Sequence, residues 1–247
     1  MIVAEVNNIS LYVPVYNYNA FSIKKKILHL LGRDKSSPIL GGKLILNNIN
    51  FKIFNGDRIG VIGANGAGKT SLLKTISKIY YPTKGSVKLN LPVTSILDIS
   101  LGIYGEATGM ENIYIRGMFL GLNKNAIDKR LQEIIEISGL NNMINQPVYS
   151  YSSGMSMRLA FAVSMILEPE LLILDEWLAV GDYQFQLTIK KKLNSFIKKT
   201  KALLFASHSL DQIKDICNRV IYMKRGEIVF DGSPEDAIKF YTNDSSK

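Results

Sequence analysis

The chain has 247 residues, 47% of them hydrophobic, so it can bury a substantial core, and we expect a single domain over residues 1–247. Lysine and arginine exceed aspartate and glutamate by 30 to 21, and the resulting net charge of +9 makes a nucleic acid and an anionic membrane surface rival partners. The single cysteine, Cys217, excludes an internal disulfide. No apolar window of about 18 residues and no signal-peptide pattern is present, so we expect a cytosolic protein that does not span a membrane.

Residues 17–43 are interpreted as an insertion that follows a first strand. They contain a run of lysines at 24–26, followed by the apolar stretch 27–31. Such a basic and apolar segment suits anionic lipid or a membrane partner, and it equally suits a surface helix that packs on its own domain. The next two strands are expected near residues 45–53 and 59–62.

A glycine-rich segment then joins the second of these strands to a helix-like stretch near 69–79. Its pattern is G-x-x-x-x-G-K-T. Because a strand that turns sharply into a helix directs backbone N–H groups and the positive helix end at one point, the segment predicts a polyphosphate site, a P-loop. The lysine brings a charge to the β- and γ-phosphates, and the threonine hydroxyl can ligate Mg²⁺. The expected phosphate-binding residues are Gly63, Ala64, Asn65, Gly66, Ala67, Gly68, Lys69, Thr70 and Ser71, of which Thr70 is also a metal ligand.

The stretch from about 92 to 160 is richer in helical periodicity than the rest of the chain. Within residues 125–138, the side chains of Ile127, Leu131, Ile134 and Ile135 share one helical face. We therefore expect a helical subdomain over about 92–160. Near its end, small hydroxyl and glycine residues at 152–154 precede an apolar helix-like stretch, and this arrangement predicts a second anion site at a helix N-terminus.

Two carboxylates, Asp175 and Glu176, follow the short apolar run 171–174, which is typical of a buried parallel strand. Beside a P-loop, Asp175 can hold Mg²⁺ through water, and Glu176 can orient the water that attacks the γ-phosphate. Further strands are expected near 202–207, 219–223 and 227–230, with a helix near 184–199. This alternation predicts an α/β fold with a largely parallel central sheet.

The segment from Tyr151 to Arg158 resembles the signature loop of ABC ATPases, L-S-G-G-Q-x-x-R. Ser152, Gly154 and Arg158 match it, whereas positions 151, 153 and 155 depart from it. The resemblance implies a P-loop NTPase of ABC type, with a RecA-like core around a mixed or parallel sheet, a helical subdomain and an antiparallel β part. It also implies ATP and Mg²⁺ as cofactors. In such a protein Ser152, Ser153 and Gly154 meet the γ-phosphate held by the other subunit of a head-to-tail homodimer.

The same resemblance implies roles for several other residues. Asp182 closes the D-loop-like segment 178–182 and would contact nucleotide, while His208 would act beside Glu176 by contacting the γ-phosphate and positioning the water. The family's Q-loop glutamine is missing from residues 96–106, where Asp98 and Glu106 are the polar candidates and neither is assigned. Tyr12 is the candidate for stacking on adenine; the alternative is an aromatic that packs under the insertion.

Two further segments narrow the resemblance. The sequence E-A-T-G-M-E-N-I at 106–113 and Y-S-S-G-M at 151–155 resemble the ATPase subunits of polysaccharide exporters. This resemblance implies a peripheral subunit at the cytoplasmic face of the bacterial inner membrane, where it would bind an integral-membrane permease and drive export of a lipid-linked polysaccharide such as O-antigen, capsule or a teichoic-acid-like polymer. A different ABC transporter, an importer or a lipid or drug exporter, is the alternative.

We expect no nucleic acid partner. ABC-type ATPases that act on DNA interpose long coiled coils between P-loop and signature, whereas only about eighty residues separate the two here, without sustained heptads.

Overall fold

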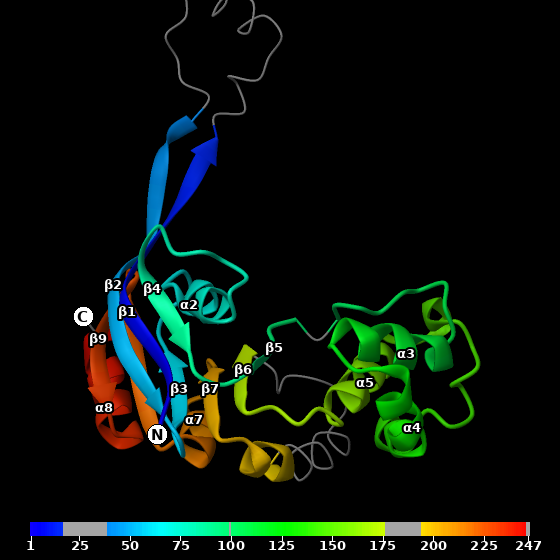
Figure 1. Cartoon of the computed structure of the whole chain (residues 1–247). Helices are drawn as coiled ribbons and strands as arrows, with labels where there is room; N and C mark the ends of the chain where they lie inside the picture. Colours follow the sequence, from blue (N-terminus) through cyan, green and yellow to red (C-terminus); the bar gives the residue numbers. More distant parts are fainter. Residues whose placement is uncertain (17–38, 99, 176–193, 246–247) are drawn as a thin grey trace, which may run out of the picture.

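The computed structural model describes residues 1–16, 39–98, 100–175 and 194–245 (Figure 1). The strands are β1 (Ile2–Tyr16), β2 (Ile39–Phe54), β3 (Arg58–Ile62), β4 (Lys84–Leu89), β5 (Val93–Ile96), β6 (Leu171–Asp175), β7 (Ala202–Ala206), β8 (Arg219–Lys224) and β9 (Glu227–Gly232). The helices are α2 (Lys69–Ile76), α3 (Gly109–Phe119), α4 (Lys124–Ser138), the 3-10 turn η2 (Val148–Ser150), α5 (Ser153–Ser164), α7 (Leu210–Ile216) and α8 (Pro234–Ser245).

A central sheet of six strands has the order β5-β6-β7-β3-β8-β9. All neighbouring strands in it are parallel except β9, which runs antiparallel to β8. Strands β6 and β7 are continuous apolar runs because both of their faces are covered. Alternate residues therefore enter two different cores: Leu172 and Leu174 pack with the helices α3 to α5, whereas Leu171 and Ile173 pack with α2 and the second sheet. The expected α/β fold is confirmed.

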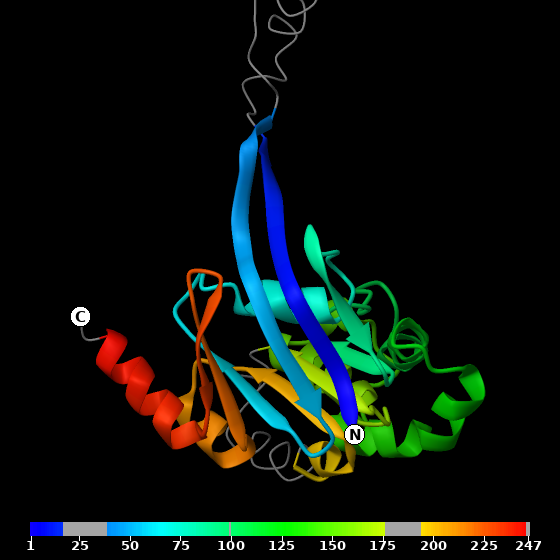
Figure 2. The ribbon, with the colours of Figure 1, turned by 60° about the vertical axis from the view of Figure 1, so that its left-hand side comes forward.

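The second sheet is antiparallel, with the order β2-β1-β4. Strands β1 and β2 form a long antiparallel pair that rises from the body of the molecule (Figure 2). Residues 39–43, assigned to the insertion from sequence, lie in β2, where Lys43 is paired with Val13 and Ile39 with Tyr16. The remainder of that expected insertion, 17–38, lies outside the described residues.

Helices α3, α4 and α5 form a group beside the sheet (Figure 1). Helix α4 covers the stretch predicted from periodicity, with Ile127 and Ile134 fully buried. Helix α3 begins with a capping box, in which Thr108 and Glu111 satisfy each other's backbone N–H groups. The first residues of the 92–160 stretch form β5, which pairs with β6 in the central sheet.

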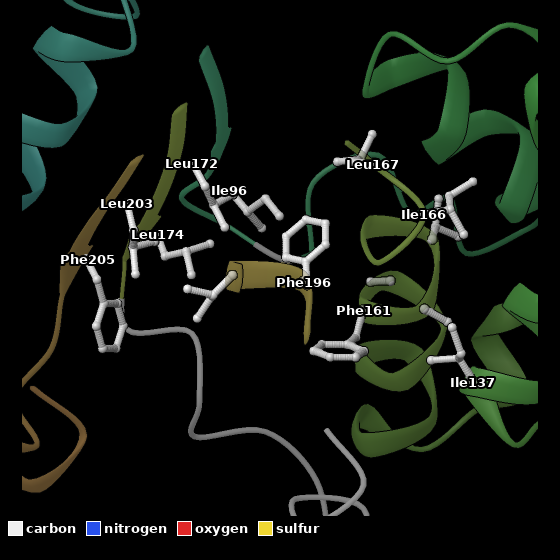
Figure 3. Packing of buried hydrophobic residues seen from close by; sticks show 14 of the residues in the cluster. Ile96, Ile137, Phe161, Ile166, Leu167, Leu172, Leu174, Phe196, Leu203 and Phe205 are labelled. Carbon is white, nitrogen blue, oxygen red and sulfur yellow. The ribbon is translucent and has the colours of Figure 1, made fainter. Parts of the chain in front are cut away.

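A continuous apolar core joins the helical group to the sheet. Figure 3 shows Phe196 lying between Leu174 of β6 and the α5-side residues Ile166 and Leu167. Phe196 belongs to residues 194–199, the described and helical part of the helix expected near 184–199. The ring is 5% exposed, so it bridges the two parts of the molecule as a core residue.

Candidate functional site

Three of the predicted motifs meet at one edge of the central sheet. In the register of the sheet, Val61 of β3 is paired with Ala206 of β7, and Ala206 is paired with Asp175 of β6. The P-loop begins two residues after Val61, and His208 lies two residues after Ala206. Because the carboxyl ends of parallel strands share one edge of a sheet, the register brings the phosphate loop, Asp175 and His208 together.

The backbone of the P-loop requires glycine at its start. Gly63 has a φ of +149°, and a Cβ on it would lie 2.3 Å from the carbonyl oxygen of Met223 on β8. Gly68 has a φ of +104° and is the N-cap of α2, so no side chain blocks the helix N-terminus. Lys69 is folded back over the loop, where its Nζ donates hydrogen bonds to the carbonyl oxygens of Gly63 (2.8 Å) and Ala64 (3.2 Å).

A cavity of about 460 Å³ opens in front of this loop. Its described lining consists of Lys43, Leu44, Ile45, Asn65, Gly66, Gly68, Lys69, Thr70, Ser71, His208 and Arg225. Three of these residues are lysine or arginine and none is acidic, and the size is within the range of small-ligand sites. A cationic cavity at a helix N-terminus that is lined by glycine backbone is suited to a polyphosphate ligand.

His208 is held at this cavity by the residues on either side of it. The Ser207 hydroxyl accepts a hydrogen bond from the backbone N–H of Ser209 (3.1 Å), and Ser209 is in turn the N-cap of α7. The imidazole is exposed at the cavity wall, where it can donate to a bound phosphate.

Residues 152–154, the predicted second anion site, lie outside the described lining of this cavity. Ser152 is the N-cap of α5, and its hydroxyl accepts a hydrogen bond from the backbone N–H of Met155 (3.2 Å). Ser152 and Ser153 are exposed, and a Cβ on Gly154 would touch nothing closer than 3.9 Å, so this helix N-terminus is open to an incoming group. None of these three residues is in the described lining of the P-loop cavity.

Other expected residues have different positions. Tyr12 lies on β1 opposite Leu44, which lines the cavity, although Tyr12 itself is not in the described lining. Asp98 accepts hydrogen bonds from the backbone N–H (2.8 Å) and hydroxyl (2.6 Å) of Ser100, and these bonds lower the pKa of its carboxyl. Glu106 is exposed, and neither acid is in the described lining. Glu176 and Asp182 lie outside the described residues.

Sequence reasoning missed Arg225 and the β2 residues 43–45 at the cavity. Arg225 has a φ of +51° in the turn between β8 and β9. The next residue, Gly226, donates its N–H to the Ala67 carbonyl (2.9 Å) and accepts from the N–H of Asn47 (2.8 Å), so the turn is bound to both the P-loop and β2. The Arg-Gly pair between two strand-like runs signals a turn, but nothing in the sequence indicates that this turn folds onto the P-loop.

The oxygen ligands available at this edge of the central sheet suit a hard cation such as Mg²⁺. Thr70 is the second residue of α2, and Asp175 is the last residue of β6, which is separated from β3 by β7 alone. Hydroxyl and carboxylate oxygens together with phosphate oxygens are the ligands that Mg²⁺ takes in nucleotide sites. Within the described residues there is no group of three or more His, Cys, Asp or Glu that would form an all-protein metal site. The described helices also include none that is long and apolar enough to cross a membrane.

The fold and the cavity define a P-loop nucleotide-binding protein. The ABC transporter family model matches residues 46–179. The chain is 36% identical to the O-antigen export system ATP-binding protein RfbB of Klebsiella pneumoniae, over 97% of each chain. It is 39% identical to the teichoic acids export ATP-binding protein TagH of Listeria monocytogenes, over 79% of this chain and 58% of that one.

Among solved structures, the fold matches a dimeric ATP-binding cassette in a post-hydrolysis state bound to ADP and Pi. The TM-score is 0.69, with 17% identity over 94% of this chain and 98% of that one. The chain therefore belongs to the ABC transporter family, as an ATP-binding protein that hydrolyses ATP and works within a transporter complex. The resemblance inferred from the motifs is confirmed.

Proposed function

We propose that the chain is the ATP-hydrolysing subunit of an ABC transporter that exports a lipid-linked polysaccharide across the bacterial cytoplasmic membrane. The observation that carries this proposal is the likeness, over nearly the whole chain, to a protein named for O-antigen export. A second likeness is to a protein named for teichoic acid export. The two named polymers differ chemically, so we assign the broader substrate class, a lipid-linked cell-surface polymer, and not one particular polymer.

A structural contact supports the narrower assignment. The two segments that resemble polysaccharide exporters touch each other: the Tyr151 hydroxyl donates to the Met143 carbonyl (2.6 Å), and a Cβ on Gly109 would lie 2.3 Å from that hydroxyl. The backbone N–H groups of Val148 and Tyr149, just before the second segment, donate hydrogen bonds to the carbonyls of Ala107 and Gly105, both at 2.9 Å. The two segments are thus packed against each other.

We further propose that the chain acts as a head-to-tail homodimer with Mg²⁺ and ATP at each P-loop. The exposed N-terminus of α5 would complete the site on the partner subunit, since residues 152–154 are absent from the described lining of their own cavity. Thr70 and Asp175 would hold Mg²⁺, and Glu176, His208 and Asp182 would act on the γ-phosphate and its water. Binding of ATP would close the dimer, and hydrolysis would reopen it.

The membrane partner would be an integral-membrane permease that contacts the helical group from the cytoplasmic side. The described surface of this group carries several exposed large apolar side chains: Leu101, Tyr104, Ile115, Met118, Phe119 and Tyr149. Apolar side chains gathered on one part of a surface are typical of an interaction site. The chain itself would then be a peripheral subunit of the inner membrane.

Deletion of the gene in its host tests the proposal. We expect surface glycan to disappear while lipid-linked polymer accumulates inside the cell, because synthesis continues when export stops. Complementation with the unaltered gene should restore export, and Lys69→Ala should not, whereas Lys88→Ala, at an exposed lysine on β4, serves as the matched control and should restore it. Unchanged surface and internal glycan pools would favour a different ABC transporter.

The ATP site is tested with the purified chain. Lys69→Ala removes the cation that is folded over the P-loop, so ATP affinity should fall by at least about tenfold. Glu176→Gln should bind ATP normally, hydrolyse it at least about a hundredfold more slowly and accumulate as a closed dimer. Equilibrium ATP titration, phosphate release and gel filtration with ATP measure these effects. Full turnover by Glu176→Gln would remove Glu176 from the mechanism.

A further inference from the structure

The most deeply buried charged side chain described in the molecule is Arg116 of α3. It is 1% exposed, and its guanidinium makes three hydrogen bonds. Nε donates to the Ala160 carbonyl (2.9 Å), Nη2 donates to the Ser164 hydroxyl (3.0 Å), and Nη1 donates to the Leu101 carbonyl. All three acceptors are uncharged, so the arginine does not serve here to neutralise a buried acid.

These three acceptors lie on two parts of the chain that matter for the ATP site. Ala160 and Ser164 belong to the far half of α5, whose N-terminus carries the signature residues 152–154. Leu101 lies in the connecting segment, described at residues 97–98 and 100–108, between the end of β5 and the start of α3. Strand β5 is paired with β6, so the connecting segment starts beside the strand that ends in Asp175.

The charges near Arg116 also connect α3 to the connecting segment. Burial lowers the pKa of Arg116 to about 10, and the nearby carboxylate of Asp98 acts in the opposite direction, so the guanidinium is charged at neutral pH. Asp98 itself lies in the connecting segment, and its own pKa is lowered first by its bonds to Ser100 and then by Arg116 and by Lys74 of α2. The connecting segment is thus in the field of one cation from α3 and of another from the helix that follows the P-loop.

We propose that Arg116 is a positioning residue that fixes the signature helix α5 relative to the connecting segment, so that a shift of this segment at the P-loop side is transmitted to residues 152–154. A planar guanidinium with several fixed donors can hold three acceptors at once, whereas an ammonium is a single point of charge. This inference rests on the proposed homodimer, in which residues 152–154 complete the partner subunit's ATP site.

Kinetics of the full-length chain provide the first test. In Arg116→Lys the charge is kept but the three-point contact is lost, and we expect kcat to fall by at least about tenfold while ATP affinity stays within about twofold, because the P-loop is untouched. Arg130→Lys is the matched control, since Arg130 is a half-exposed arginine of α4 in ion pairs with Glu133 (3.2 Å) and Glu168 (3.0 Å). Its kcat should remain within about twofold of wild type.

Dimer formation provides a readout that a merely structural role would not move. In the Glu176→Gln background, ATP should produce a dimer on gel filtration, and adding Arg116→Lys should reduce the dimer fraction at saturating ATP by at least about fivefold. If Glu176→Gln alone forms no dimer, the proposed homodimer fails. If the doubly altered chain dimerises as well as Glu176→Gln does, the homodimer stands and the role of Arg116 is refuted.

A milder variant keeps the test decisive if Arg116→Lys does not fold. Ser164→Ala removes one of the three acceptors and leaves a helix-compatible side chain, so kcat should fall by about threefold with an unchanged ATP affinity. An unchanged kcat in folded Ser164→Ala would overturn the proposal. A parallel loss of ATP affinity and kcat would also overturn it, because it would indicate general damage to the fold.

Discussion

At the scale of the residue, two glycines of the P-loop differ in the space available for a side chain. Gly63 and Gly66 both have positive φ, at +149° and +78°. A Cβ on Gly66 would meet nothing within 4 Å, whereas a Cβ on Gly63 would lie 2.3 Å from the backbone oxygen of Met223. The loop therefore closes against β8 at Gly63 and is open to ligand at Gly66.

This difference predicts unequal costs for the same substitution. Gly66→Ala should lower the free energy of unfolding by about 1 kcal/mol, since only strain is added. Gly63→Ala adds an overlap with backbone that cannot rotate away, and its total cost should exceed about 3 kcal/mol. Urea unfolding of both purified variants measures the difference. Equal losses would mean that the contact with Met223 relaxes freely.

At the scale of the element, the start of α3 and the signature loop hold each other in place through Tyr151. Burial raises the pKa of the Tyr151 phenol, so its hydroxyl remains a donor to the Met143 carbonyl across the physiological range. Gly109 leaves the space that this hydroxyl occupies. In the wider family a leucine, which has no hydroxyl, stands at this position of the signature.

A double-mutant cycle tests this contact. Tyr151→Phe should cost about 1 kcal/mol of unfolding free energy, the usual value of one hydrogen bond. Gly109→Ala should cost about 2 kcal/mol in the native chain, because its Cβ would overlap the hydroxyl. In the Tyr151→Phe background the same change should cost about 1 kcal/mol less, since that oxygen is gone while the Ile144 carbonyl at 2.9 Å and the Ile144 Cδ1 atom at 3.1 Å remain close. Strict additivity would show that the two segments are independent.

The elements that the sequence predicted best are those with a clear pattern of apolar side chains of their own. The apolar runs of β3, β6 and β7 are recognisable because both faces of these strands are buried, and α4 is recognisable because Ile127 and Ile134 recur on one face. Strand β4 was missed, because it is short, contains a glycine and has no fully buried residue, so the alternation of Val87 and Leu89 with exposed residues is too brief to stand out. The Arg225 turn and the contacts of Arg116 with α5 were missed because they join segments more than forty residues apart in the chain.

At the scale of the whole molecule, two buried titratable groups in the core shared with the helices α3 to α5 favour their neutral form. Cys217 follows α7 and packs near Gly60 of β3, while Tyr222 of β8 donates a hydrogen bond to Asp244 of α8 (2.7 Å). Burial is the main cause in both cases, and it raises the pKa of Cys217 from 9.0 to about 12 and that of Tyr222 from 10.0 to about 12. Both groups belong to the core that joins the helices to the sheet.

A raised pKa in the folded state stabilises the fold below the pKa of the unfolded chain, and this contribution is lost as pH rises toward the folded value. The free energy of unfolding should therefore begin to fall above pH 9 as unfolded Cys217 ionises, and should fall more steeply between pH 10 and 12, where unfolded Tyr222 also ionises. Urea unfolding of the wild type and of Cys217→Ala/Tyr222→Phe, measured from pH 8 to 11, isolates the contribution of these two groups. The altered chain should be less stable at pH 8 and should lose less stability up to pH 11, because it has neither group left to ionise. Parallel curves for the two proteins would show that neither group is linked to folding.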